Sequence, residues 1–110
     1  MKQLSVHELA ARAVDAPASM QLLDVREPWE CALAPIHLPG VATLAIPMGS
    51  VPARLDELPH SRSVVCICHH GARSAQVVAF LMQRGWTDVY NLAGGIDAWS
   101  TQVDPAVPRY

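Results

Sequence analysis

The chain has 110 residues, of which 51% are hydrophobic and only 16% are charged. This composition is typical of a globular protein and excludes a disordered chain, which would carry more charge and fewer Val, Ile and Leu residues. The length predicts a single domain over residues 1–110. The formal net charge of −2 offers no basic surface for nucleic acid or for an anionic membrane, so neither is an expected partner.

Two features exclude a targeting or membrane segment. Polar and charged residues soon after Lys2 interrupt any apolar core of a signal peptide. The longest stretch without Asp, Glu, Lys or Arg, residues 31–53, contains four prolines, which remove donors and break helical pairing. We therefore expect a cytoplasmic protein without a membrane span.

The first part of the chain predicts one helix and two strands. Ser5 and Glu8 form a capping-box pattern, which predicts a helix to about Asp15. The dense apolar run at residues 21–25 predicts a buried strand. Residues 43–46 form a second run of this kind, which predicts another strand.

The middle of the chain predicts a helix followed by the most apolar strand. Ser50 is expected to cap a helix that carries Leu55 and Leu58 on its inner face. Residues 63–68 form a strand with apolar side chains on both faces. Strands of this kind belong to the interior of a parallel sheet that is covered on both sides.

The next helix is expected over residues 74–84, and most of its circumference should be packed. Only Gln76, Gln83 and Arg84 interrupt its apolar surface. Gly85 is expected to end it with a left-handed C-terminal cap.

The last part of the chain predicts a short strand over residues 89–91, a helix from Gly95 through Trp99, and a tail over residues 102–110. The tail contains two prolines and is expected to lie extended along the surface. The alternation of strands and helices predicts an α/β domain with a mostly parallel sheet and right-handed crossovers. In such sheets the chemistry lies at the carboxyl ends of the strands.

The loop between the most apolar strand and the most apolar helix carries the chemical signal. Cys68 ends the strand and faces a helix N-terminus, whose dipole and free N–H groups favour a thiolate. Arg73 supplies a permanent cation that a tight loop can bring back toward the sulfur. Gly71 gives the loop its φ freedom, and Ser74 is expected to cap the helix. On chemistry alone, a reactive thiol and a buried packing cysteine both stay open.

The other candidate residues favour structural roles. The three cysteines cannot all pair, and Cys31 and Cys66 are interpreted as packing residues. A Cys66–Cys68 disulfide is disfavoured because positions i and i+2 of a strand lie near the bridging limit. Asp24 and Arg26 are expected to form a structural ion pair rather than a catalytic one.

A metal site is not expected at this loop. Cys66, Cys68, His69 and His70 carry ligand-type side chains. Adjacent histidines rarely converge on one ion, however, and no second Cys/His pair follows to complete a tetrahedral site.

Several motifs, taken in order, resemble the single-domain rhodaneses, which are sulfurtransferases. They cover about four fifths of the chain and include the family's active-site pattern Cys-x4-Arg-Ser. The matching segments are residues 22–27 (Leu-Leu-Asp-Val-Arg-Glu), 36–40, 46–47, 68–74, 85–86 and 89–99.

The resemblance implies a three-layer fold with a five-stranded sheet flanked by helices. It implies that Cys68 takes a sulfane sulfur from a donor such as thiosulfate, carries it as a persulfide, and passes it to cyanide or to a thiol of a small molecule or protein. No other cofactor is expected. Arg73 would hold the anionic end of the donor and Ser74 the outer sulfur. The backbone would form the anion cradle through the N–H groups of His69, His70, Gly71, Ala72, Arg73 and Ser74.

Alternatives of other classes stay open at this point. A non-catalytic rhodanese-like binding module is one, and an arsenate reductase or phosphatase on the same fold is another. Four residues separate Cys68 from Arg73, whereas the related phosphatases have five, which disfavours phosphatase activity. His69 and His70 lie at positions that vary in the family, and both solvent-facing and proton-transfer roles remain for them. We expect a monomer.

Overall fold

The computed structural model describes all 110 residues and has an α/β architecture built on one five-stranded parallel sheet with strand order β1-β5-β4-β2-β3. The strands are β1 (Lys2–Leu4), β2 (Met20–Asp24), β3 (Ala42–Ala45), β4 (Ser63–Ile67) and β5 (Val89–Leu92). The α-helices are α1 (Val6–Asp15), α2 (Pro28–Leu33), α3 (Ala72–Gln83) and α4 (Gly95–Gln102), with 3-10 segments at Pro17–Ser19 and Met48–Glu57. None of these helices has the length and apolar character needed to cross a membrane.

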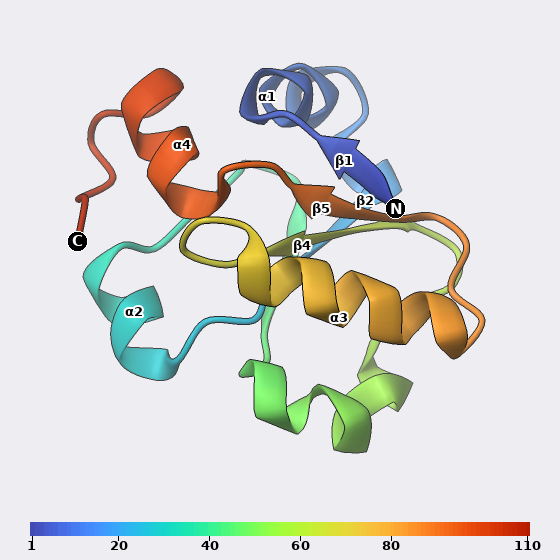
Figure 1. Ribbon diagram of the computed structural model, residues 1–110. Coiled ribbons are helices and arrows are strands. Elements are labelled where there is room, and N and C mark those ends of the chain that lie inside the picture. The colour runs from blue at the N-terminus through green and yellow to red at the C-terminus, as the bar shows by residue number, and fades with distance from the viewer.

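Helices cover both faces of the sheet, as the sequence predicts. Figure 1 shows α1 and α4 on one face, with α3 and the 3-10 segment Met48–Glu57 on the other. The central strand β4 contributes side chains to two core clusters. Val65 and Ile67 belong to one cluster, and Val64 and Cys66 belong to the other. A strand buried on both faces needs apolar residues at consecutive positions. This explains why β4 is the most apolar run in the sequence.

The fifth strand, β1, is not indicated by the residue pattern. It has three residues, and Lys2 and Gln3 are exposed while Leu4 is buried. It pairs in parallel with β5 at the edge of the sheet. Three residues with one buried side chain are too few to give a periodic signal, so only the resemblance predicted a sheet of five strands.

Helix α3 begins two residues earlier than predicted, and its cap is different. Gly71 is the N-cap, with φ +107°, and the helix begins at Ala72. Ser74 therefore lies inside the first turn, is fully buried, and does not cap the helix as predicted. A left-handed glycine allows the chain to turn directly from the loop into the helix.

The segment predicted as a helix capped by Ser50 is a 3-10 segment, Met48–Glu57, and no side chain caps it. Pro52 lies inside it, and Arg54 has non-helical backbone angles. A proline in this position removes a donor that an α-helix would require. A helix is therefore present as predicted, but it is of the 3-10 type, it begins at Met48 and Ser50 does not cap it. Val51 and Leu58 are buried, and Leu55 packs partly buried against the same core.

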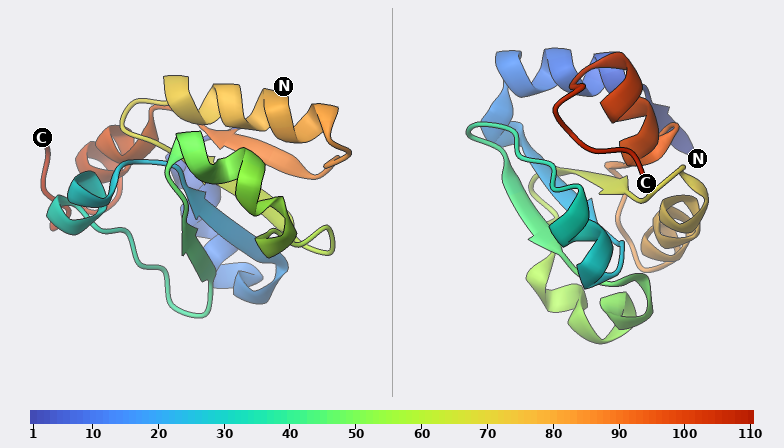
Figure 2. Two further views of the ribbon diagram at one scale, coloured as in Figure 1. Left: turned by 90° about the horizontal axis from the view of Figure 1, so that it is seen from below. Right: turned by 90° about the vertical axis from the view of Figure 1, so that its left-hand side faces the viewer.

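The tail also differs from the prediction. Val107 is buried, and its carbonyl accepts a hydrogen bond of 2.5 Å from the Ser100 hydroxyl. Beyond this anchor the chain runs toward α2, and Figure 2 shows its end near the carboxyl edge of the sheet. The tail thus lies at the surface as predicted, but it contains turns and is anchored at Val107 instead of running fully extended.

Candidate active site

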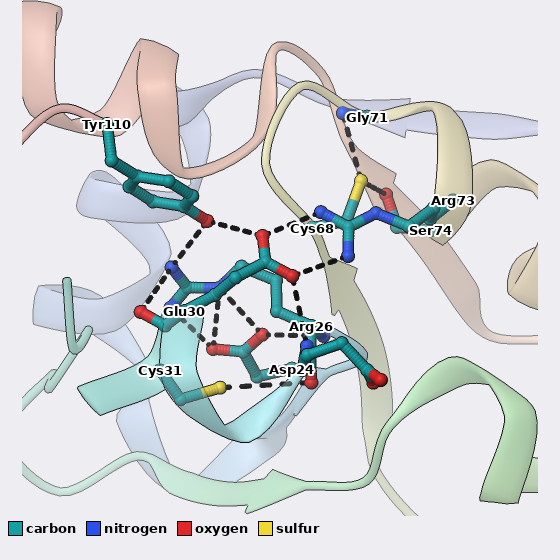
Figure 3. A network of polar contacts seen from close by, with 10 residues as sticks. Asp24, Arg26, Glu30, Cys31, Cys68, Gly71, Arg73, Ser74 and Tyr110 are labelled. Atoms are coloured by element: carbon teal, nitrogen blue, oxygen red, sulfur yellow. Dashed lines mark hydrogen bonds and ion pairs between the residues drawn. The ribbon is translucent and has the colours of Figure 1, made fainter. Parts of the chain in front are cut away.

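Cys68 lies directly after β4, and two donor groups lie within hydrogen-bond distance of its sulfur. The residue is 1% exposed. The Gly71 N–H donates to Sγ at 3.1 Å, and the Ser74 Oγ lies 3.2 Å from Sγ (Figure 3). The loop predicted from the sequence therefore surrounds the sulfur, and its donors favour a sulfur atom that carries negative charge.

Helix α4 holds the loop from behind. The N–H groups of Ile96 and Asp97 donate to the carbonyls of Cys68 and His69 at 2.9 and 3.1 Å. The C=O and N–H groups of a trans peptide point in opposite directions. The N–H groups that follow these two carbonyls therefore point away from α4. The contact requires glycine at position 95, because a Cβ there would lie 2.5 Å from both carbonyl oxygens.

Asn91, from β5, supports Ser74 and the loop. Its side-chain Nδ2 donates to the Gly71 carbonyl at 3.2 Å and to Gln3 at 3.1 Å. Its Oδ1 lies 2.5 Å from the Ser74 hydroxyl. A serine has one proton to donate, so the hydroxyl serves either Asn91 or the sulfur of Cys68. When it serves Asn91, its oxygen is free to accept the S–H of a protonated Cys68.

Arg73 forms a bidentate ion pair with Glu30 rather than standing as a free cation at the sulfur. Its two terminal nitrogens lie 2.7 and 2.8 Å from the Glu30 oxygens. The hydrogen bonds from Arg73 are the main cause that lowers the pKa of Glu30 to about 2, against its burial. The structure adds to the sequence-based expectation for Arg73 a carboxylate from α2 that compensates its charge.

Asp24 and Arg26 form the expected ion pair, which is almost fully buried. The Arg26 Nη2 lies 2.8 Å from Asp24 and also 2.8 Å from the carbonyl of Ala34. The Arg26 Nη1 reaches the Glu30 carbonyl at 3.3 Å. The pair thus ties the end of β2 to the backbone carbonyls of Glu30 and Ala34, in the middle and at the C-terminal end of α2.

The two histidines of the loop have different surroundings. The ring of His69 is stacked between those of His70 and Tyr110, with both centroid distances at 3.9 Å. Its Nε2 is buried without a hydrogen-bond partner, and burial, followed by the neighbouring His70, lowers the pKa of His69. His70 is 66% exposed and lies 3.9 Å from Asp97. A solvent-facing role therefore fits His70 but not His69.

Cys31 and Cys66 are free thiols with the surroundings of packing residues. Burial raises the pKa of Cys66 to about 12 and that of Cys31 to about 11. Neither thiol ionises at neutral pH. No group of three or more His, Cys, Asp or Glu side chains is placed to hold a metal ion.

Sequence reasoning did not identify Glu30, Asn91 or Tyr110 as part of this site. Glu30 carried one local signal, because Glu27 and Glu30 form the capping box of α2. Asn91 is a polar residue within a buried strand, which is a second signal. Tyr110 carried none, since its hydrogen-bond partners Arg26 and Glu30 lie 84 and 80 positions away in the chain.

Comparison with known proteins gives consistent matches. A family model described as a rhodanese-like domain matches residues 5–102. A sulfurtransferase of Allochromatium vinosum is 38% identical over 107 residues, which are 97% of this chain and 95% of that protein. A rhodanese-like/PpiC domain-containing chloroplast protein of Arabidopsis thaliana is 36% identical over this whole chain, which spans 38% of that protein. The crystal structure of a rhodanese-like domain protein from Staphylococcus aureus superposes with a TM-score of 0.80 and 29% identity, covering 100% of this chain and 99% of that one.

Proposed function

Because the chain belongs to the rhodanese-like domain family, we propose that it is a sulfurtransferase that carries a sulfane sulfur on Cys68. The observation that supports this most directly is the position of the sulfur. It is buried at the centre of the loop, where a backbone N–H and a hydroxyl meet it at 3.1 and 3.2 Å. A nucleophilic thiolate and the terminal sulfur of a persulfide both need donors of this kind.

In the first proposed step, the Cys68 thiolate attacks the outer sulfur of thiosulfate. A new S–S bond forms on Cys68, the S–S bond of thiosulfate breaks, and sulfite leaves with the electron pair. The negative charge then lies on the terminal sulfur of the persulfide. The loop N–H groups that point away from α4, together with the Ser74 hydroxyl, would stabilise that charge.

In the second proposed step, an acceptor anion attacks the terminal sulfur. Cyanide would leave as thiocyanate and a thiolate as a persulfide, and in both cases the Cys68 thiolate is restored. No metal or organic cofactor enters this balance. The protein supplies a dry, donor-lined cradle for an anionic sulfur.

Arg73 would have two parts in this scheme. Two of its five N–H groups bind Glu30, which fixes the first turn of α3 against α2. The remaining three are available to the anionic end of a donor, and the side chain is 35% exposed. Arg73 would therefore meet the sulfonate of thiosulfate as a positioned partner of an ion pair rather than as a free cation.

The proposal is tested by weighing the intact protein after incubation with thiosulfate and removal of the excess. We expect wild type to gain the mass of one sulfur atom and to lose it on addition of cyanide. Cys68→Ser should gain nothing, whereas Cys31→Ser, the matched control at the partly exposed thiol, should behave like wild type. A sulfur gain by Cys68→Ser equal to that of wild type refutes the assignment.

Sulfur uptake and a phosphatase assay together separate the competing classes of function. If neither wild type nor Cys68→Ser takes up sulfur from thiosulfate or from a small-molecule persulfide, the chain is a binding module rather than a sulfurtransferase. Release of phosphate from an aryl phosphate faster than sulfur transfer would favour the phosphatase alternative, which the loop of four residues between Cys68 and Arg73 disfavours.

A further inference from the structure

Tyr110 contacts both sides of the candidate active site, although it lies far from that site in the sequence. Its hydroxyl contacts the ion pairs that support the loop (Figure 3), and its ring stacks on His69, the first residue after Cys68. Building on the proposed function, we propose that Tyr110 is a positioning residue of the active site, which sets the reactivity of Cys68 by fixing Glu30 and His69.

The hydroxyl of Tyr110 links two ion pairs. It donates to the Oε2 of Glu30 at 2.8 Å and accepts from the Nη1 of Arg26 at 3.1 Å. Glu30 is 3% exposed, so its carboxylate depends on protein donors rather than on water. The same Oε2 also receives Arg73. The hydroxyl therefore takes up part of the charge of the carboxylate that orients Arg73.

The ring of Tyr110 fixes the other side of the loop. It lies parallel to the ring of His69, with a centroid distance of 3.9 Å and an interplanar angle of 10°. The edge of Trp29 packs against it at 5.9 Å. The His69 ring also stacks on the ring of His70. The ring thus restrains the residue whose carbonyl α4 holds, immediately beside Cys68.

The neighbouring residue anchors Tyr110 in this place. The Nε of Arg109 donates to Asp97 at 3.0 Å. The backbone N–H of Asp97 in turn holds the carbonyl of His69. The end of the tail and the loop therefore share one support in the first turn of α4. The side chain of Tyr110 then connects this first turn of α4 to the Glu30–Arg73 pair on α2 and α3.

Removing the hydroxyl and removing the ring should have separable effects. Tyr110→Phe keeps the stack but leaves Glu30 with one donor fewer, so more negative potential reaches the sulfur. Tyr110→Leu also frees His69. We expect alkylation of Cys68 at neutral pH to slow about threefold in Tyr110→Phe and about tenfold in Tyr110→Leu. The midpoint of the rate–pH profile should move upward in the same order.

The experiment measures iodoacetamide alkylation from pH 5 to pH 10, with all variants in a Cys31→Ser background so that the partly exposed Cys31 thiol does not contribute. Tyr90→Phe is the matched control, since Tyr90 lies on β5 and its ring faces Lys2 and Arg12 instead of the loop. It should reproduce the profile of the Cys31→Ser parent. Profiles of both Tyr110 variants that coincide with that of the parent would overturn the proposal.

A double-mutant comparison tests whether Tyr110 acts on Cys68 through Glu30. In a Glu30→Gln background, Tyr110→Phe should no longer shift the midpoint, because the charge that the hydroxyl compensates is absent. An equal shift of the midpoint in both backgrounds would show that Tyr110 does not act on Cys68 through Glu30. Alkylation does not require sulfur transfer. A failure of the proposed function would therefore appear only in the thiosulfate mass experiment, and the two outcomes are distinguishable.

Discussion

The charges nearest to Cys68 come in compensated pairs. Arg73 binds Glu30, and Arg26 binds Asp24, with only Arg73 appreciably exposed. The electrostatic surroundings of the sulfur therefore depend on how completely Glu30 cancels Arg73. A change to either partner alters this balance in a defined direction.

Arg73→Ala and Glu30→Gln should shift the alkylation profile of Cys68 in opposite directions. Loss of the cation leaves an uncompensated carboxylate and raises the midpoint, whereas loss of the carboxylate leaves an uncompensated cation and lowers it. We expect shifts of about half a pH unit to one pH unit. Each change should also lower the free energy of unfolding by about 1–2 kcal/mol, because the remaining partner loses the charge-assisted hydrogen bonds of the pair.

The control for this comparison is the exposed ion pair between Arg54 and Glu57, in which both side chains are about two-fifths exposed. Arg54→Ala and Glu57→Gln make the same changes in charge away from the loop and should leave the profile unmoved. Shifts of the same sign in Arg73→Ala and Glu30→Gln would show that the pair acts through loop geometry rather than through charge.

At the scale of single residues, the sequence predicted what is local. Cys68, Gly71, Arg73 and Ser74 lie within seven positions, so both the chemistry of this loop and its resemblance to a known active-site pattern can be read from one short segment. The partner of Arg73, by contrast, lies 43 positions away. A contact between side chains so far apart in sequence leaves no periodic or motif signal, so only the structure shows that Glu30 is the partner of Arg73.

At the scale of elements, the contact between α4 and the loop is the tightest constraint on the site. The sequence predicted a helix from Gly95 through Trp99, and the structure begins α4 at Gly95 and continues it to Gln102. The pattern did not show that Cys68 and His69 place their carbonyls against this helix. The boundaries of helices and strands were predicted well where apolar periodicity marks them. The start of α3 was predicted less well, because the φ of Gly71 sets the position at which this helix begins.

Alanine substitutions at three glycines should separate backbone strain from steric conflict. Gly49 has neither a positive φ nor a neighbour within 4 Å of an added Cβ. Gly85 has φ +101° but open space, and Gly95 has φ +59° together with the two carbonyl oxygens at 2.5 Å. We expect Gly85→Ala to cost about 1 kcal/mol of unfolding free energy and Gly95→Ala at least about 3 kcal/mol, with Gly49→Ala near zero.

Chemical denaturation measures these costs, and sulfur uptake from thiosulfate measures their effect on the loop. Gly95→Ala should lose most of its uptake even at temperatures where it is folded, because its Cβ displaces the carbonyls beside Cys68. Gly85→Ala should keep its uptake. Equal uptake in Gly85→Ala and Gly95→Ala would mean that the contact with α4 does not shape the cradle.

At the scale of the whole molecule, sheet topology brings distant segments together. All five strands are parallel, so β2, β4 and β5 end at the same edge of the sheet. Asp24 ends β2, Cys68 follows β4, and Gly95 begins the helix after β5. The strand–helix alternation predicted this edge as the place for chemistry. It did not predict that the end of the tail contacts the site at this edge, because an irregular segment has no periodic residue pattern from which its position can be inferred.

The Glu30–Arg73 pair should make the stability of the folded protein depend on pH below about 5. The pKa of Glu30 is lowered to about 2 in the folded state, from 4.5 for a free glutamate. A lowered carboxyl pKa contributes stability that is fully present above about pH 5 and is lost as the pH falls toward 2. We expect about 2 kcal/mol to be lost over this range, since the partly exposed guanidinium of Arg73 weakens the effect.

Glu30→Gln tests this dependence, because it removes the titrating group and keeps the shape of the side chain. Urea denaturation at pH 7 should find wild type more stable than Glu30→Gln, and the difference should shrink toward zero by pH 2.5. Glu57→Gln, in the exposed pair, should change the pH dependence far less. A difference between wild type and Glu30→Gln that stays constant from pH 7 to pH 2.5 would show that Glu30 supports the fold by shape rather than by charge, and the same result would remove the electrostatic basis for the opposite shifts expected at Cys68.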